Sequence, residues 1–124
     1  MYDRQTDQAP APVGPYSQVR TGGGLIFTAG FGPQDPVTGV VPPDIGGQTK
    51  QVLANVEAAL GVYGATLADV IKATVHLQDL ARDFDGFNAA YREVMSQPYP
   101  VRTTVGSDLA SILVEIDVVA VAPQ

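Results

Sequence analysis

Hydrophobic and polar residues alternate along two long segments of the chain, which is the pattern of a strand buried on one face only. In segment 113–121, one side carries Val114, Ile116, Val118 and Ala120, and the other carries Glu115, Asp117, Val119 and Val121. In segment 70–78, Ile71, Ala73, Val75 and Leu77 alternate with Lys72, Thr74, His76 and Gln78. Shorter β-forming runs occupy 16–20, 25–29 and 101–105, and the glycine-rich 21–24 between the first two predicts a hairpin.

Two other segments place apolar residues three or four positions apart, which predicts amphipathic helices. Segment 48–63 has its apolar stripe at Val52, Val56, Ala59 and Leu60, and Gly64 is a suitable stop. Segment 81–97 has its stripe at Phe84, Phe87, Tyr91, Val94 and Met95, with Asp83 as the expected N-cap. Residues 30–47 are rich in glycine and proline, so they predict a long loop of the kind that often carries function.

These elements follow the order β-β-α-β-α-β-β, which predicts an α+β domain. Because each helix has one apolar stripe, both are expected on one face of a single mixed sheet. The other face of the sheet then has no cover within the chain, although Val119 and Val121 project from it. An uncovered apolar face predicts self-association.

Length and composition predict one domain over residues 1–124, with residues 1–10 as a flexible arm. The chain has no cysteine and a single histidine, His76, so no metal site built by the protein is expected. A net charge of -6 with scattered basic residues argues against nucleic acid as a partner. No apolar run approaches the ~20 residues of a membrane span, and the start lacks the apolar core of a signal peptide, so a cytoplasmic protein is expected.

Arg102 lies in a β-forming segment, where a guanidinium is costly to bury without an anionic partner. Its planar fork of donors matches a carboxylate. That carboxylate is either Glu115 or Asp117 on a neighbouring strand, in an internal salt bridge, or it belongs to a bound ligand. His76 is not expected to form a catalytic triad with Ser107 and Asp108, because nothing in the sequence brings them together.

Seven stretches, taken in order, resemble the RidA family, which is also called the YjgF family. They are "GPYSQ" (14–18), "IFTAG" (26–30), "DPVTGVVPPDIGGQTKQVLANVEAAL" (35–60), "DVIKATVHLQDL" (69–80), "FNAAYREVM" (87–95), "YPVRTTV" (99–105) and "VEIDVVAV" (114–121). The resemblance covers nearly the whole chain. It implies a chorismate-mutase-like fold and a homotrimeric barrel with its sites in the clefts between subunits.

The resemblance also implies an activity, namely the hydrolysis of reactive 2-enamino and 2-imino acids to 2-keto acids and ammonia, without a cofactor. Arg102 matches the family arginine that grips the substrate carboxylate, and Glu115 matches the glutamate associated with the hydrolytic water. Tyr16, Asn88 and Gly30 match further residues of the family's site. The same resemblance gives backbone groups near Gly30 and Thr104 the role of positioning the imine.

The chain departs from RidA proper at three positions and in the length of one segment. Ala29 stands in place of a serine, Phe31 in place of a glutamine and Thr104 in place of a cysteine, and the segment from Arg102 to Glu115 is about two residues shorter. Ala29 removes a polar group and Phe31 is expected to add an apolar wall to the site. These changes suggest a related subgroup with either a different substrate side chain or weaker classical activity. The rival interpretations are a non-catalytic binder of small carboxylates or keto acids, an endoribonuclease, and a chaperone-like or regulatory protein.

Overall fold

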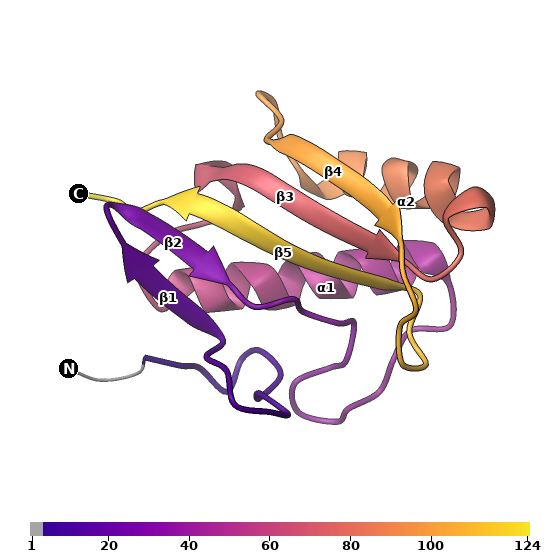
Figure 1. Cartoon of the computed structure of the whole chain (residues 1–124), viewed down its shortest axis with the longest axis horizontal. Coiled ribbons are helices and arrows are strands. Elements are labelled where there is room, and N and C mark those ends of the chain that lie inside the picture. Colours follow the sequence, from indigo (N-terminus) through magenta and orange to yellow (C-terminus); the bar gives the residue numbers. More distant parts are fainter. Residues whose placement is uncertain (1–3) are drawn as a thin grey trace.

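The computed structural model describes residues 4–124 and confirms the α+β architecture and the order of elements. The strands are β1 (Val19–Gly22), β2 (Leu25–Thr28), β3 (Val70–Leu77), β4 (Val101–Gly106) and β5 (Val114–Val121). The helices are α1 (Ile45–Gly61) and α2 (Leu80–Val94), and a short 3-10 helix, η1 (Leu67–Asp69), leads into β3. Figure 1 shows both helices behind the same face of the sheet.

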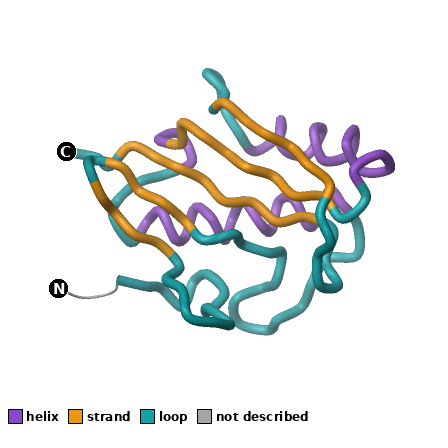
Figure 2. Tube along the Cα trace, in the orientation of Figure 1, coloured by secondary structure: helices purple, strands orange, loops and turns teal. Residues whose placement is uncertain are grey.

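The strands form one mixed sheet in the order β1-β2-β5-β3-β4. Strands β3 and β4 are parallel, and the other neighbouring pairs are antiparallel. The helices cover one face, here called the helix face, and the opposite face, here called the outer face, is turned to the viewer in Figure 2. Neither helix of the described chain combines the length and the hydrophobicity that a membrane span requires.

The core lies between the helices and the helix face of the sheet. The predicted stripe of α1 is fully buried there, as are the four alternating residues of β5 that begin with Val114. On the other side of β5, Glu115 and Asp117 are half-buried, and Val121 is exposed. The alternation predicted for this strand is therefore confirmed, and the outer face has no cover among the described residues.

Helix α2 differs from the prediction in its N-cap. The side chain of Asp79, not Asp83, accepts a hydrogen bond from the backbone N–H of Arg82 and caps the helix. Asp83 lies one turn inside the helix, where it is buried and accepts two hydrogen bonds from the Arg82 guanidinium. Asp79 takes the cap because its backbone is still non-helical, with φ -129° and ψ 87°, as an N-cap requires.

Strand β3 departs from the simple alternation at its start. A register shift against β5 between Val70 and Lys72 leaves Ile71 exposed, whereas Val70 is buried. Such an extra residue in one strand moves the preceding side chains to the other face. The alternation predicted from Ala73 to Leu77 is confirmed, and the inclusion of Ile71 in the buried set is wrong.

The first hairpin is also tighter than predicted. Only Gly23 and Gly24 form the turn, and both have positive φ values, 60° and 79°. A two-residue turn with this backbone suits glycine and matches the twist of the flanking strands. Strand β1 begins at Val19, so Tyr16 lies in the segment before the sheet and not in a strand.

The N-terminal arm lies against the domain through the buried side chain of Gln18. Its amide nitrogen donates to the carbonyl oxygens of Thr6, Ala9 and Pro10, and its amide oxygen accepts from the N–H of Thr6. Residues 1–3 of the arm expected at 1–10 lie outside the described residues. One glutamine therefore fixes the path of the chain from residue 6 to residue 10.

The long loop between β2 and α1 is attached to the helix by Asn55, which is 1% exposed. Its amide nitrogen donates to the carbonyl oxygens of Gly32 and Gln34, both at 2.9 Å. Asn55→Ala is expected to lower the free energy of unfolding by about 1–3 kcal/mol, because two partly buried carbonyls lose their donor. Urea denaturation measures this, with Lys50→Ala, at an exposed position of the same helix, as the control. Equal, small losses in the two variants would contradict the role given to Asn55.

Candidate functional site

Arg102 lies on β4 with its side chain on the helix face, in register with the buried Ala73 of β3. Its guanidinium donates a hydrogen bond of 2.7 Å from Nη2 to Oδ1 of Asn88 on α2. The same group lies 5.1 Å from the ring centroid of Phe87 and 4.9 Å from that of Tyr91. Two aromatic faces and one amide oxygen therefore hold this cation in a fixed orientation.

The internal salt bridge considered for Arg102 is not formed. Within residues 4–124, the ion pairs join Lys50 to Glu93 and Arg82 to Asp79 and Asp83. Glu115 and Asp117 project from the other face of the sheet. Within the described residues, the guanidinium of Arg102 is therefore without a carboxylate partner.

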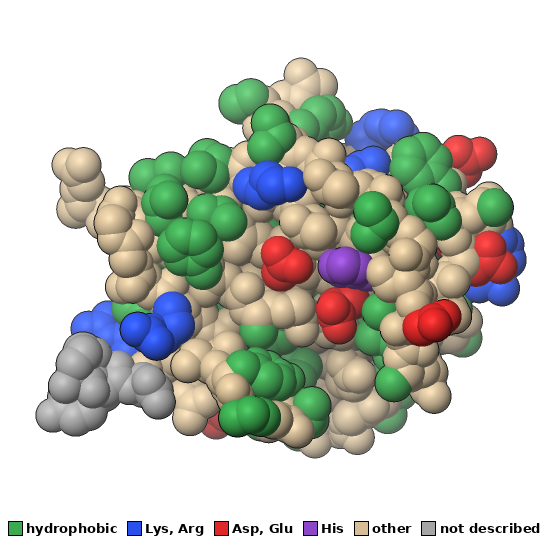
Figure 3. All heavy atoms as spheres, viewed as in Figure 1, with side chains coloured by type: hydrophobic (Ala, Val, Ile, Leu, Met, Phe, Trp, Pro, Cys, Tyr) green, Lys and Arg blue, Asp and Glu red, His purple; other side chains and the backbone are tan. Residues whose placement is uncertain are grey.

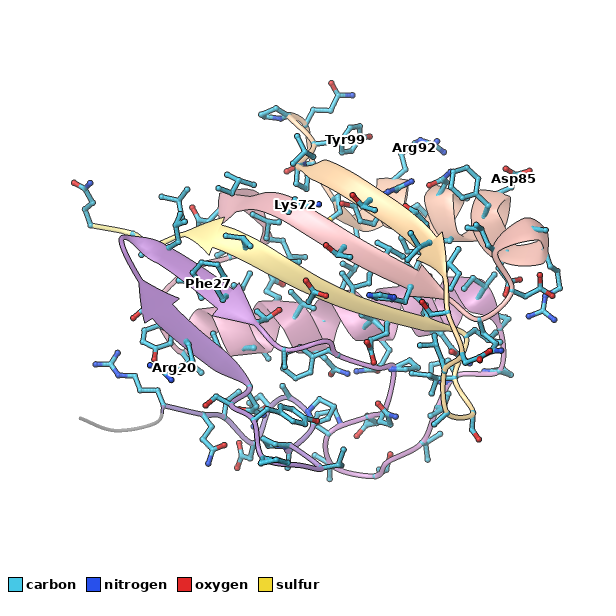
Figure 4. The ribbon with its side chains drawn as sticks, in the orientation of Figure 1. Arg20, Phe27, Lys72, Asp85, Arg92 and Tyr99 are labelled. Atoms are coloured by element: carbon cyan, nitrogen blue, oxygen red, sulfur yellow. The ribbon has the colours of Figure 1, made fainter. Side chains whose placement is uncertain are left out.

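A hollow of about 430 Å³ surrounds Arg102. It is called the arginine hollow here, and its lining residues are Asn88, Tyr91, Arg92, Tyr99, Pro100 and Arg102. Figure 4 shows Tyr99 and Arg92 at the same end of the molecule, where α2 ends and β4 begins. Thr104 follows two residues after Arg102 on the same face of β4, in register with the buried Val75.

Three residues of the arginine hollow were missed at the level of sequence as site residues. The sequence pattern places Tyr91 in the packing stripe of its helix and indicates no role for Arg92 or Tyr99. The spacing could have indicated Tyr91 and Arg92, because they lie three and four positions after Asn88 on the same helix. Tyr99 lies three positions before Arg102, across a proline, and only the structure shows that it faces the hollow.

Glu115 lies on the outer face of β5, directly across from His76 of β3. Its carboxylate lies against the backbone of Gly30: a Cβ atom built at residue 30 would be 2.7 Å from Oε1 of Glu115. Only glycine leaves room for the carboxylate there. A second hollow, of about 700 Å³, is bounded by these two residues and by Tyr16, Arg20, Phe27 and Ala29 among others, and is called the glutamate hollow here.

Tyr16 reaches the glutamate hollow from the segment before β1. It is 48% exposed, and its hydroxyl oxygen accepts a hydrogen bond of 3.1 Å from the N–H of Val13. The hydroxyl proton remains available to a further acceptor. The structure thus brings Tyr16, Gly30 and Glu115 together around one hollow.

Phe31 does not form the apolar wall expected from the sequence. Its side chain is 4% exposed and belongs to the core, and its backbone exchanges two hydrogen bonds with Ile116 of β5. This bridge turns the ring inward and leaves Gly30 on the surface. Phe31 contributes to the glutamate hollow by fixing the backbone beside it, and not by lining it.

The two hollows lie on opposite faces of the sheet, so one copy of the chain does not bring Arg102 and Glu115 together. Arg102 is in register with Ala73 of β3, and Glu115 is in register with His76, three residues further along. With β3 between them, their backbones are about 14 Å apart. Asn88 and Thr104 lie with Arg102, whereas Tyr16 and Gly30 lie with Glu115.

The outer face carries a charged cluster beside the glutamate hollow. In Figure 3 the single histidine lies between acidic side chains, and hydrophobic side chains gather toward one end of the face. Burial raises the pKa of Asp117, while the neighbouring His76 and Lys72 act to lower it. No three His, Cys, Asp or Glu side chains within the described part of the chain are grouped so as to hold a metal ion.

His76 and Ser107 lie closer together than the sequence indicated. Nδ1 of His76 and Oγ of Ser107 are 2.7 Å apart, because Ser107 follows the end of β4 and its N–H donates to the carbonyl of Leu77 on β3. The prediction that nothing brings these two residues together is therefore wrong. Asp108 makes no hydrogen bond to His76 in the described chain, so the three residues do not form a triad.

Comparisons with known proteins agree with one another. The family model described as "Endoribonuclease L-PSP" matches residues 6–122. A RutC family protein of Pyrococcus horikoshii is 43% identical over 118 residues, which are 93% of each chain. The 2-iminobutanoate/2-iminopropanoate deaminase of Escherichia coli is 37% identical over 120 residues, covering 94% of this chain and 93% of the relative. The crystal structure of Escherichia coli TdcF with bound serine superposes with a TM-score of 0.90 at 32% identity, covering 99% of this chain and 100% of the other.

Proposed function

This chain belongs to the RidA family, also named YjgF, RutC or endoribonuclease L-PSP, and from that premise we propose that it is an imine deaminase. Its reaction is the hydrolysis of small 2-imino and 2-enamino acids to 2-keto acids and ammonia. A relative 37% identical bears the name of this activity, and another has been crystallised with bound serine, a small amino acid.

The observation that carries the proposal is the state of Arg102. The guanidinium is oriented by Asn88, Phe87 and Tyr91, yet it has no carboxylate partner among the described residues. Arginine has five N–H donors, and the bond to Asn88 uses one. The remaining donors can hold a substrate carboxylate bidentately in a position fixed before binding.

The complete site requires a second copy of the chain. Arg102 and Glu115 leave the sheet on opposite faces, so a substrate held by Arg102 meets the Glu115 of a neighbouring copy. The exposed Phe27, Val101, Val105 and Val121 give the outer face an apolar surface that another copy can cover. We propose the homotrimer that the family resemblance implies, with the arginine hollow of one copy facing the glutamate hollow of the next.

In this arrangement Glu115 acts as the general base for water. Its carboxylate takes a proton from the water as the oxygen attacks the carbon of the protonated imine, which gives a carbinolamine. A proton then reaches the nitrogen, the C–N bond breaks, ammonia leaves and the carbonyl of the keto acid forms. The substrate carbon is already electrophilic, so positioning by Arg102 and Asn88 and proton transfer by Glu115 supply the chemistry that the protein must add.

The proposal is tested by measuring ammonia and keto-acid release from freshly generated 2-iminobutanoate with and without the protein. Acceleration above the spontaneous rate is expected. Binding of 2-oxobutanoate without any acceleration would instead identify a non-catalytic carboxylate binder. Cleavage of RNA without imine hydrolysis would instead identify an endoribonuclease, the activity named in the description of the family model. The net charge of -6 argues against this outcome, because a negatively charged protein repels RNA.

Gly30→Ala is expected to lower kcat by about 10- to 100-fold, because the new methyl group pushes the Glu115 carboxylate from its place. KM is expected to change little, since the arginine hollow is untouched. The melting temperature is expected to stay close to that of the wild type, because the atom displaced is the end of a flexible side chain. Gly22→Ala is the matched control, as a Cβ there meets nothing within 4 Å. An unchanged kcat in Gly30→Ala would contradict the role of Glu115.

A further inference from the structure

The arginine hollow contains more positive charge than one carboxylate needs. Both Arg92 and Arg102 line it, and neither forms an ion pair within residues 4–124. The acidic residue next to Arg92, Glu93, is paired with Lys50 at 3.0 Å. An exposed arginine, Arg92, and a half-buried one, Arg102, thus line one hollow without an ion-pair partner from the described chain.

The hollow also contains a hydrogen-bonding group that has no partner. The hydroxyl of Tyr91 is buried, makes no hydrogen bond in the structure, and belongs to a side chain that is 5% exposed and lines the hollow. Such groups are rare in native proteins, because an unpaired buried hydroxyl is costly, and they point to a missing partner. Burial also raises the pKa of Tyr91, so its hydroxyl keeps its proton and remains a donor at neutral pH.

The tip of Tyr99 adds a second hydroxyl at the rim of the hollow beside Arg92 (Figure 4). Arg92 has one structural role of its own, because it lies in the last turn of α2, where a cation is favoured by the helix dipole. That role accounts for a cation at the helix end. It does not account for the buried Tyr91 hydroxyl, which has no hydrogen-bond partner. It also does not account for the nearby Arg102 guanidinium, which has no acidic partner among the described residues.

We propose that the preferred substrate is a 2-imino dicarboxylic acid. The carboxylate next to the imine binds Arg102 and the Tyr91 hydroxyl, and the distal carboxylate binds Arg92 and the Tyr99 hydroxyl. This inference rests on the proposed deaminase function and names its substrate class. The hollow of about 430 Å³ is within the usual range for small-molecule sites. The reaction is unchanged: water adds to the imine carbon, ammonia leaves, and the product is a 2-keto dicarboxylic acid.

The first test is binding of the two keto acids 2-oxoglutarate and 2-oxopentanoate, measured by calorimetry at pH 7. They have the same carbon chain and differ in the distal carboxylate. The wild type is expected to bind the diacid about tenfold more tightly. Arg92→Gln is expected to abolish this preference and to leave the affinity for the monoacid unchanged. Arg4→Gln, the same substitution at an exposed arginine that lies over Tyr63 and outside the arginine hollow, is expected to keep the preference.

Equal affinity of the wild type for both acids, or a preference that survives Arg92→Gln, would overturn the inference. Hydrolysis rates of the two corresponding imines separate this result from the proposed function. A protein that hydrolyses 2-iminopentanoate but has no diacid preference retains the deaminase function and loses the two-anion site. A protein that hydrolyses neither imine but shows an Arg92-dependent preference retains the two-anion site and loses the deaminase function.

Discussion

Arg102→Ala is expected to lower kcat/KM for 2-iminobutanoate hydrolysis by about 10²- to 10³-fold, which corresponds to about 3–4 kcal/mol. The substrate carboxylate loses its bidentate partner, and Asn88 and the two aromatic rings are left facing an empty space. The loss should fall on both KM and kcat, because the arginine sets affinity and also the position of the imine carbon. Steady-state release of ammonia measures it.

Two companion variants make this result specific. Arg102→Lys keeps the charge and loses the planar fork, so it is expected to recover only a small part of the lost activity. Lys50→Gln removes one charge from an exposed ion pair and is expected to retain wild-type activity. If Arg102→Ala were as active as the wild type, the carboxylate would have to bind elsewhere, and the proposed site would be wrong.

The second large effect is a recovery of activity when two inactive variants share one assembly. Arg102→Ala and Glu115→Gln are each expected to be nearly inactive alone. In the proposed arrangement, a site takes its arginine from one copy and its glutamate from the next. When the variants are coexpressed in equal amounts and assemble at random, about one quarter of the sites contain both intact residues.

Coexpression with different affinity tags and purification on both tags isolates the mixed assemblies for this measurement. Their activity is expected to be well above that of either variant and to exceed that of a simple mixture of the two purified variants. The control is coexpression of the double variant with an Arg102→Ala chain, which supplies no intact arginine. A mixed assembly as inactive as its parents would contradict a site shared between neighbouring copies.

The secondary structure was largely predictable because it follows from local patterns. Strand β5 and helix α1 have strong periodicity, and burial in the structure follows it residue by residue. The predictions were wrong at places where a single residue determines the register of a strand or the start of a helix. The register shift at Ile71 turns a single side chain outward, and the cap of α2 passes to Asp79 because its backbone is non-helical.

The residues of the candidate site could be indicated from the sequence, but their arrangement in space could not. The resemblance to a family indicated Arg102, Glu115 and their companions, but spacing along the chain does not show that they leave the sheet on opposite faces. That depends on the register of β3 with β4 and β5, which is set by tertiary packing. The same limitation explains Phe31, whose bridge to Ile116 turns its ring into the core, and Ser107, which reaches His76 only because β3 and β4 are parallel.

The placement of Arg102 and Glu115 on opposite faces also has a consequence for heredity. In the proposed trimer each chain lends its arginine to one neighbour and its glutamate to the other. In a trimer with two normal chains, one chain that lacks both residues therefore inactivates the two sites to which it contributes, and one site remains intact. In a cell that makes normal and defective chains together, the defective gene would be partly dominant. Each defective chain inactivates two sites, and at each of them a normal neighbour can supply the other residue.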